Sequence, residues 1–189
     1  KGGSSYRKSL YPEYKQNRKD KIAEQTAEDA LAFEEFIEEY NQTLIEAQKQ
    51  GLTVVMFDGV EADDIAAVLA TNIDNAPYNE VWLISSDRDW DLLLSDKVSR
   101  FSYVTRKEYT IDNWGTHYDC EPEEYISVKC LMGDPGDNVP GVPSIGPKRA
   151  VSLIKEYGSA LDIVDALPIQ SKYKYVSALN EFGARGILL

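Results

Sequence analysis

The longest periodic segment of the sequence follows Thr26. Apolar residues recur at three- and four-residue spacing from Ala30 to Ala47, which predicts an amphipathic α-helix. Thr26 and Asp29 have the spacing of a capping box at its start, and Gly51 predicts its end. The other face of this helix is acidic, and it carries Glu34, Glu35, Glu38 and Glu39.

Short apolar runs follow this helix. LTVVMF (52–57) and VWLIS (81–85) predict buried strands, and EADDIAAVLA (61–70) between them predicts a helix. The segment 98–111 is β-rich, and WDLLL (90–94) is helical. Strands that alternate with helices are typical of an α/β fold with a parallel sheet.

The patterns at the two ends differ from this alternation. Residues 1–21 lack periodicity and predict a loop. Beyond residue 120 only helices are expected, at 122–133, 148–158 and 159–167, with the last of these as the closing helix. We therefore expect two domains, an α/β core over 1–120 and a small helical lobe over 121–189.

The formal net charge of −12 argues, taken alone, against nucleic acid as a partner. The distribution changes that picture, because residues 1–21 hold seven Lys or Arg against Glu13 and Asp20, and the other acidic residues lie downstream. A basic segment beside acidic clusters suits a protein that meets a polyanion through metal ions. The basic residues are Lys1, Arg7, Lys8, Lys15, Arg18, Lys19 and Lys21.

The cysteines and the apolar runs indicate a cellular setting. Cys120 and Cys130 lack zinc-ligand spacing, and His117 is the single histidine, so we expect reduced thiols in a cytoplasmic protein and no zinc. No apolar run approaches the roughly 20 residues needed to span a bilayer. No signal peptide is visible after the basic start.

Three acidic clusters carry the candidate chemistry: DGVEADD (58–64), SDRDWD (86–91) and GDPGDN (133–138). The first two follow predicted strands, and parallel strands would bring them to one edge of the sheet. Any one cluster is more simply explained as helix caps. Three together would repel one another without cations, and oxygen ligands without His or Cys select magnesium or manganese. Two divalent ions are therefore predicted.

The segment GVPSIGPKRA (141–150) predicts a tight turn that opens a helix. Gly141 and Gly146 frame the turn, and Pro147 suits the first helical position. Backbone N–H groups at such a helix start can hold a phosphate, with charge added by Lys148 and Arg149. An ordinary helix–turn–helix remains the alternative.

GVEADD, SSDRDWD, MGDPGDN and GVPSIGPKRA, in this order, resemble the flap endonuclease / 5′-3′ exonuclease family, above all its small stand-alone bacteriophage members and the nuclease domain of bacterial DNA polymerase I. The resemblance implies a PIN-like parallel-sheet core, a helical arch over about 11–50 and a C-terminal helix–hairpin–helix lobe. It also implies a monomeric structure-specific 5′ nuclease of replication or repair, in the host cytoplasm if phage-encoded. Its cofactors would be two Mg²⁺ ions, replaceable by Mn²⁺, and one K⁺.

The same resemblance assigns roles to residues. Asp91 would be structural. Tyr14 would stack on a base, and Lys15 and Arg18 would reach the scissile phosphate as the catalytic cations. The first metal would take Glu61, Asp63 and Asp64, the second Asp134 and Asp137, and Asp87 and Asp89 would lie between them. Main-chain carbonyls would hold the potassium ion, from Leu131, Met132, Pro140, Val142 and Ile145. The hairpin would contact duplex DNA through Ser144, Gly146, Lys148 and Arg149.

The ends of the chain depart from the family pattern. Family members begin with two strands that each end in an aspartate of the metal site, and the resemblance places residue 1 just after the second. The end, EFGARGILL, also looks cut short, so we expect a piece of a longer protein, whose activity by itself is in question. A non-catalytic branched-DNA-binding module stays open as an alternative. So does a PIN-like ribonuclease, although the hairpin argues against it.

Overall fold

The computed structural model describes residues 4–189, so Lys1 of the basic segment lies outside the described residues. Contacts divide the chain into two compact units. Unit 1 holds the residues up to Glu61 together with Gly136–Asn138, and unit 2 holds Ala62–Pro135 and Val139–Leu189. The expected boundary near residue 120 therefore does not coincide with the border between these units.

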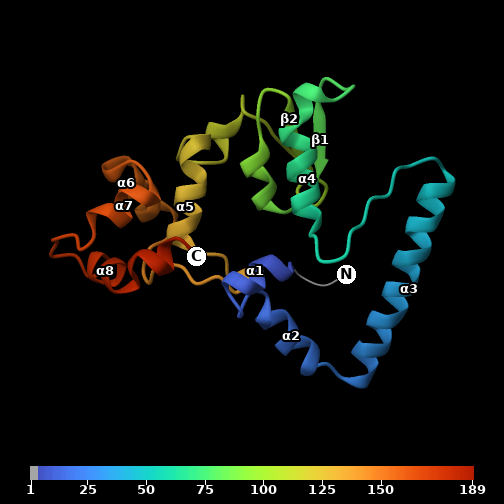
Figure 1. The fold of residues 1–189 in the computed structure, drawn as a ribbon, viewed down its shortest axis with the longest axis horizontal. Coiled ribbons are helices and arrows are strands. Elements are labelled where there is room, and N and C mark those ends of the chain that lie inside the picture. The colour runs from blue at the N-terminus through green and yellow to red at the C-terminus, as the bar shows by residue number, and fades with distance from the viewer. Residues whose placement is uncertain (1–3) are drawn as a thin grey trace. The chain divides into compact units, whose positions relative to one another are not determined.

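Unit 1 contains the helices α1 (Ser5–Leu10), α2 (Gln16–Ala23) and α3 (Ala27–Lys49) (Figure 1). The expectation of a loop over residues 1–21 was wrong, because α1 and most of α2 form there. Neither helix buries a residue, and α1 is held instead by Ser4, whose hydroxyl accepts the Arg7 N–H at 3.1 Å. The sequences of α1 and α2, SYRKSL and QNRKDKIA, hold too few apolar residues to show a helical period.

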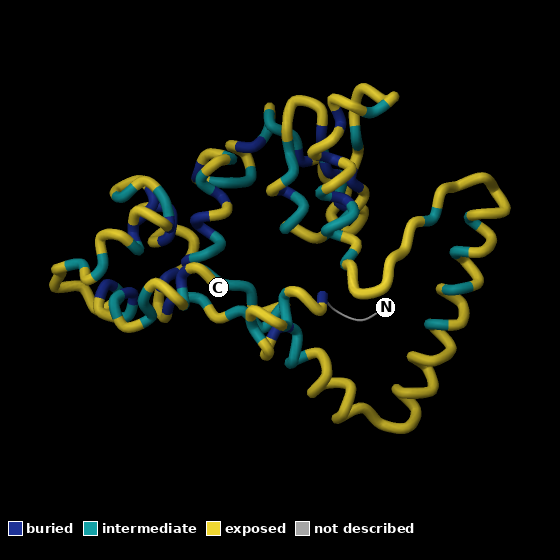
Figure 2. Tube along the Cα trace, viewed as in Figure 1, coloured by how far each residue is buried: buried dark blue, intermediate teal, exposed yellow. Residues whose placement is uncertain are grey.

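Helix α3 forms as predicted. The Thr26 hydroxyl accepts the Asp29 N–H at 3.1 Å, and the Asp29 carboxylate accepts the Thr26 N–H at 3.2 Å, which confirms the capping box. Gly51 follows the helix with φ +83°, in the left-handed region that favours glycine. No residue of α3 is buried, and Figure 2 shows it exposed along most of its length.

The strand expected over 52–57 is absent from the structure. This segment has no regular secondary structure, and nearly all of it is exposed. A strand needs a neighbour for its N–H and C=O groups, and no strand among residues 4–189 pairs with it. The run is apolar enough for a strand. Whether it forms one depends on a neighbouring strand to hydrogen-bond with, and the sequence of the run does not show whether such a neighbour is present.

Unit 2 contains one sheet in the order β1 (Val81–Ile84), β2 (Val98–Ser102) and β3 (Lys107–Tyr109). β1 and β2 are parallel as predicted, with Val81 opposite Val98. β3 is antiparallel to β2, so an all-parallel sheet was wrong. The connection from Ser102 to Lys107 is a tight turn, with Arg106 at φ 57°, and a parallel return would need a long crossover.

Helix α4 (Ala62–Thr71) covers this sheet and forms a small apolar cluster with it, centred on Ala66, Ala70, Leu83 and Val98. The expected helix at 90–94 is a 3₁₀ helix, η2 (Arg88–Leu93), which also packs on α4. Further short 3₁₀ helices complete the connections, and they are η1 (Ile73–Asn75), η3 (Trp114–Thr116), η4 (Pro122–Glu124) and η5 (Pro135–Asp137).

The rest of unit 2 is helical, with α5 (Tyr125–Met132), α6 (Pro147–Tyr157), α7 (Ala160–Ala166) and α8 (Lys174–Ile187) around the larger core. Leu131, Ile163 and Leu179 are fully buried there. The expectation that 159–167 closes the chain was wrong, since α8 follows. Gly183 takes φ +67° inside α8 and marks a kink in the helix, although Val176, Leu179 and Ile187 keep an apolar face buried. No helix in the described part of the chain is long and apolar enough to cross a membrane.

A buried ion pair holds η2 against the sheet. The Arg100 side chain, 1% exposed, donates to both carboxylate oxygens of Asp91 and to the Ser85 carbonyl at 2.9 Å. Its guanidinium lies 3.9 Å from the centre of the Tyr109 ring. The Tyr118 hydroxyl also donates to Asp91, which raises the pKa of Tyr118, after the larger effect of its burial. Asp91 therefore has the structural role that we expected.

We predict that Arg100→Met lowers the free energy of unfolding by about 3–5 kcal/mol, because it leaves the Asp91 carboxylate buried without a partner. Chemical denaturation at pH 7 measures the change. Arg185→Met, at an exposed site in the last turn of α8, is the matched control and should change stability by less than about 0.5 kcal/mol. Equal losses in the two variants would contradict a structural role for the pair.

Candidate functional site

The acidic residues after β1 lie in and before η2. The Asp87 carboxylate accepts the Asp89 N–H at 3.0 Å and so caps η2. The simpler explanation of this cluster, as a helix cap, is therefore true of Asp87. A cap uses only part of a carboxylate's acceptor capacity, so it leaves oxygen lone pairs for a further partner. Capping does not exclude a metal role for this residue.

Lys129 of α5 joins two of the acidic clusters within unit 2. Its ammonium donates to Asp89, and it lies 3.5 Å from Asp134 Oδ2. The carboxylates of Asp89 and Asp134 thus converge on one positive charge. Burial raises the pKa of Asp89, and the nearby Asp87 and Asp134 carboxylates add to that rise. Burial would lower the pKa of Lys129, but the hydrogen bond to Asp89 outweighs it, and the pKa is raised.

Sequence reasoning missed Lys129. The available signal is that it is the one charged residue in the apolar run YISVKCLM of α5. A lysine in such a run needs a partner for its charge. Here the partners are two predicted metal ligands, which makes Lys129 part of the site.

Asp63 and Asp64 occupy the first turn of α4. The Trp90 indole N–H donates to Asp63 Oδ1. Trp90 lies between Asp89 and Asp91 in η2, and its ring packs against the small apolar cluster. This contact was also missed, although an aromatic residue inside the acidic run SDRDWD could have drawn attention to it.

Glu61 and Asp137 belong to unit 1, where basic and phenolic groups surround them. Glu61 accepts from Lys15 at 2.7 Å, from the Tyr14 hydroxyl at 2.9 Å and from Arg7 at 3.1 Å. Burial would raise the pKa of Glu61, but the hydrogen bonds from Lys15 and Tyr14 outweigh it and hold the pKa below its usual value. The Glu61 carboxylate is therefore charged at neutral pH.

Asp137 shares two of these partners. The Tyr14 hydroxyl donates to it at 2.9 Å, and the Lys15 ammonium lies 3.5 Å away. Arg18 adds a hydrogen bond of 2.6 Å. The predicted catalytic cations, Lys15 and Arg18, thus contact the predicted metal ligands Glu61 and Asp137.

The stacking role expected for Tyr14 stays a prediction, which the burial of the ring does not favour. A base can stack only on an accessible ring, whereas Tyr14 is 7% exposed. The hydroxyl instead links Glu61 to Asp137, and the Lys15 ammonium lies 4.8 Å from the ring centre. Burial and the two carboxylates raise the pKa of Tyr14, so the hydroxyl stays protonated and able to donate.

Four of the seven predicted metal ligands are thus brought together in two pairs. Asp89 and Asp134 share Lys129, and Glu61 and Asp137 share Lys15. Within residues 4–189, no three His, Cys, Asp or Glu side chains lie close enough together to hold a metal ion. The donor chemistry fits magnesium or manganese, since all the paired atoms are carboxylate oxygens. The full ligand set remains a prediction.

A backbone hydrogen bond and a close backbone approach fix the conformation of the hairpin, residues 141–149. The Val142 N–H donates to the Leu131 carbonyl at 2.9 Å, which places two of the five expected potassium ligands on adjacent segments. A Cβ atom on Gly141 would lie 1.9 Å from the Met132 carbonyl oxygen, so only glycine fits. The Leu131 and Val142 carbonyls each accept one hydrogen bond and keep a second lone pair.

The helix start after the hairpin forms as predicted, with Gly146 as N-cap and Pro147 at the first position of α6. Arg149 donates to the Ser144 carbonyl, and its guanidinium lies 5.2 Å from the centre of the Tyr175 ring. Tyr175 stacks in turn on Tyr173, at 5.5 Å between ring centres. Arg149 is therefore oriented from two sides.

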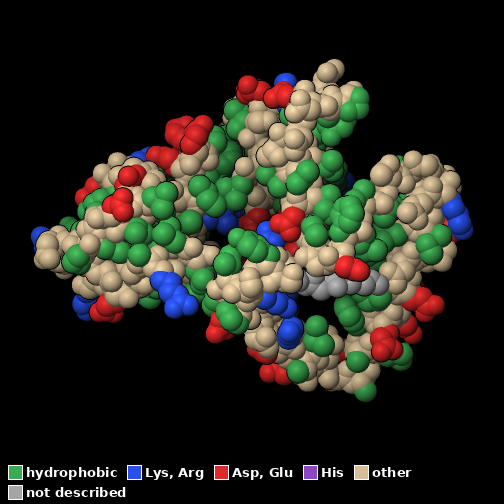
Figure 3. All heavy atoms as spheres, in the orientation of Figure 1, with side chains coloured by type: hydrophobic (Ala, Val, Ile, Leu, Met, Phe, Trp, Pro, Cys, Tyr) green, Lys and Arg blue, Asp and Glu red, His purple; other side chains and the backbone are tan. Residues whose placement is uncertain are grey.

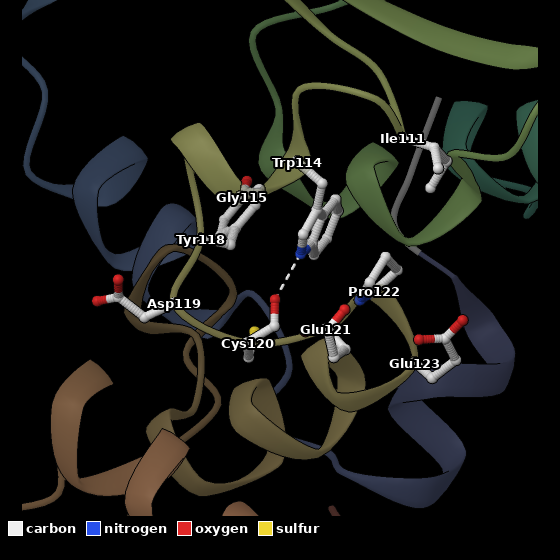
Figure 4. A pocket seen from close by; sticks show the side chains of 9 residues that line it. All are labelled: Ile111, Trp114, Gly115, Tyr118, Asp119, Cys120, Glu121, Pro122 and Glu123. Carbon is white, nitrogen blue, oxygen red and sulfur yellow. Dashed lines mark hydrogen bonds between the residues drawn. The ribbon is translucent and has the colours of Figure 1, made fainter.

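A pocket of about 570 Å³ lies elsewhere in unit 2 (Figure 4). Its floor is aromatic, and the Trp114 indole N–H donates to the Cys120 carbonyl at 2.6 Å. None of the predicted site residues lines it, but Tyr118, which does, donates to Asp91 of the acidic run SDRDWD. The lining residues are Ile111, Trp114, Gly115, Tyr118, Asp119, Cys120, Glu121, Pro122 and Glu123.

Two family models match the chain. The 5′-3′ exonuclease N-terminal resolvase-like domain matches residues 1–119, and the 5′-3′ exonuclease C-terminal SAM fold matches residues 120–186. Both descriptions agree with a mixed α/β N-terminal part followed by a helical C-terminal part.

Individual relatives agree with these models. The flap endonuclease of Escherichia phage T5 is 46% identical over 95% of this chain, and the chain spans 62% of that protein's length. DNA polymerase I of Mycobacterium tuberculosis is 35% identical over 85% of this chain and 17% of its own length.

Solved structures of the phage T5 protein are also similar. The T5 D15 protein co-crystallised with metal ions has a TM-score of 0.90 and 44% identity, with 100% of this chain and 71% of that chain covered. A variant of the T5 D15 flap endonuclease, in a pseudo-enzyme–product complex with DNA and metal ions, has a TM-score of 0.89 and 43% identity. The match covers 100% of this chain and 70% of that chain.

We predict that Lys129→Met lowers the free energy of unfolding at pH 7 in chelator by about 1–2 kcal/mol, because Asp89 and Asp134 then face each other without a counter-charge. The loss should shrink as the pH falls and the carboxylates take up protons. Denaturation across pH measures it. Lys155→Met is the control, since its ammonium contacts only the Asp119 carbonyl in an exposed position. A loss that does not change between pH 7 and pH 4 would contradict this explanation.

Proposed function

The chain belongs to the 5′-3′ exonuclease family, and from this membership we propose that it acts in a structure-specific 5′ nuclease that hydrolyses DNA phosphodiester bonds at flaps or junctions during replication or repair. The observation that carries the proposal is the convergence of the Asp89 and Asp134 carboxylates on one cation. The relatives support it, since one is named a flap endonuclease and a solved structure holds DNA and metal ions.

We propose that two divalent metal ions, Mg²⁺ with Mn²⁺ as a substitute, are held by the seven acidic residues predicted from the sequence. Such ions lower the pKa of bound water and stabilise the charge on the leaving oxygen. The lysine-bridged pairs support the proposal, because oxygens that already converge on an ammonium suit a small divalent cation. Asp87, Asp63 and Asp64 complete the set.

The basic groups of unit 1 have a separate task in this proposal. Lys15 and Arg18 neutralise the charge that develops on the scissile phosphate. Their contacts with Glu61 and Asp137 support this role, because the phosphate that reacts must lie beside the metal ligands. Helices α2 and α3 would form the arch of the nuclease, through or under which the 5′ strand passes, and the sheet of unit 2 would belong to a PIN-like core.

The hairpin supplies the proposed duplex contact. Figure 3 shows acidic side chains in several separate groups on the visible face, and the net charge is −12, so we expect DNA to be bound at a few local sites. The α6 start offers backbone N–H groups at Gly146 and the charges of Lys148 and Arg149. Ser144 and a potassium ion on the hairpin carbonyls would complete the helix–hairpin–helix grip on the backbone.

Asp87→Asn should abolish cleavage of a 5′-flap DNA, because it removes charge that both metal sites use. Single-turnover cleavage by the nuclease that contains this chain, with Mg²⁺ and with chelator, measures it. A panel of flap DNA and matched RNA separates this function from a ribonuclease. An amide at position 87 can still accept the Asp89 N–H, so cleavage at the parental rate would show that Asp87 is only a helix cap.

Asp137→Asn should act mainly through the second ion. Its cleavage rate should fall but recover in part at high Mg²⁺ or Mn²⁺, whereas that of Asp87→Asn should not. Both variants should bind flap DNA in calcium as the parent does, because the arch and the hairpin hold the substrate. Lost binding in calcium would place the two residues in substrate recognition instead.

Lys148→Ala should weaken duplex binding at every sequence and reduce the slope of log affinity against log salt by about one unit. Fluorescence anisotropy across a salt series measures both quantities. Lys155→Ala, later on the same helix, serves as the control. An unchanged slope would show that Lys148 is a solvated surface residue.

A further inference from the structure

The one tryptophan of the acidic run makes a contact that the proposed function does not yet use. Trp90 lies in η2, and its indole N–H donates to Asp63 Oδ1 at the first turn of α4. The ring itself is half-buried against the small apolar cluster of Leu83, Val98 and Ala66. The N–H is therefore held in place by packing and aimed at a predicted metal ligand.

The kind of donor matters for a metal site. An indole N–H is neutral and can only donate, so it neither competes with a metal ion for the carboxylate nor is repelled by it. Lys129, in contrast, brings a full positive charge to Asp89 and Asp134. A neutral donor on one oxygen of Asp63 can stay in place while the other oxygen binds a cation.

Orientation of a ligand also affects affinity. Donors that hydrogen-bond to a metal-ligating side chain fix its rotamer, and their loss commonly weakens metal binding by about 10–100-fold. Asp63 stands in the first helical turn, where its side chain would otherwise choose among rotamers. The hydrogen bond from Trp90 restricts the Asp63 side chain to one rotamer in the absence of a metal ion.

We infer that Trp90 is a positioning residue, which holds the Asp63 carboxylate in the orientation that binds a divalent metal ion. The inference rests on the proposed function, since it needs Asp63 to be a metal ligand. It adds a role for the aromatic residue in SDRDWD, whose neighbours Asp89 and Asp91 have partners of their own.

The test measures Mn²⁺ binding to the full chain by calorimetry, without DNA. Trp90→Phe keeps the ring in the cluster and removes the N–H, and it should weaken Mn²⁺ binding about 10-fold. Trp114→Phe is the matched control, because it also removes an indole hydrogen bond, to the Cys120 carbonyl, and its ring packs on Tyr118 and Tyr125, which are not predicted metal ligands. It should leave Mn²⁺ affinity unchanged even if it lowers stability.

Asp63→Asn completes a double-mutant cycle. If Trp90 acts through Asp63, then adding Trp90→Phe to Asp63→Asn should cost no further affinity. The inference would be overturned if Trp90→Phe bound Mn²⁺ with the parental affinity, or if the losses of affinity in the two single variants added in the double variant. Either result would leave the assignment of Asp63 as a metal ligand unchanged. No Mn²⁺ binding by the parent, or no loss in Asp63→Asn, would overturn the assignment of Asp63 and this inference with it.

A measurement on the unmutated chain covers the case in which Trp90→Phe does not fold. The sequence has three tryptophans, so a spectrum of ¹⁵N-labelled indole groups shows three side-chain N–H signals, assigned with Trp82→Phe and Trp114→Phe. Addition of Mg²⁺ should shift the Trp90 signal and leave that of Trp114 in place. A Trp90 signal that does not move at saturating Mg²⁺ would overturn the inference.

Discussion

The pairing of Arg100 with Asp91 is the constraint on which the acidic edge of unit 2 depends. Two charges are removed from water there, and their hydrogen bonds to each other, to Ser85 and from Tyr118 compensate for the lost solvation. The pair joins η2 to β2. Because Asp87, Asp89 and Trp90 lie within four residues of Asp91, their places follow from this one anchor.

The three aspartates of SSDRDWD therefore have three different roles. Asp91 is buried as an anchor, Asp87 caps η2, and Asp89 meets Asp134 at Lys129. Carboxylates at alternate positions would repel one another in a bare turn. The fold offsets part of this repulsion by giving each a separate partner, although Asp87 and Asp134 still raise the pKa of the buried Asp89.

The same arrangement recurs in unit 1 with different residues. A lysine, Lys15, spans Glu61 and Asp137, and a neutral donor, the Tyr14 hydroxyl, bonds to both carboxylates. In each unit an ammonium contacts two carboxylates, and an aromatic side chain donates to a carboxylate oxygen, Tyr14 in unit 1 and Trp90, to Asp63, in unit 2. The arrangement holds carboxylates close together and lowers the pKa of Glu61, and a site for divalent cations needs such clustered, ionised oxygens.

The sequence by itself determined the local features of this protein. The capping box of α3, the strands β1 and β2, the start of α6 at Pro147 and the family all follow from short motifs, because caps, turns and apolar periods depend on residues near one another in the chain. Only the tertiary structure decided that Lys129 and Trp90 hold carboxylates, that the Tyr14 ring is buried, and that 52–57 stays unpaired. Those outcomes depend on which distant segments meet, and the energy of a buried charge or an unpaired strand depends on its neighbours in space.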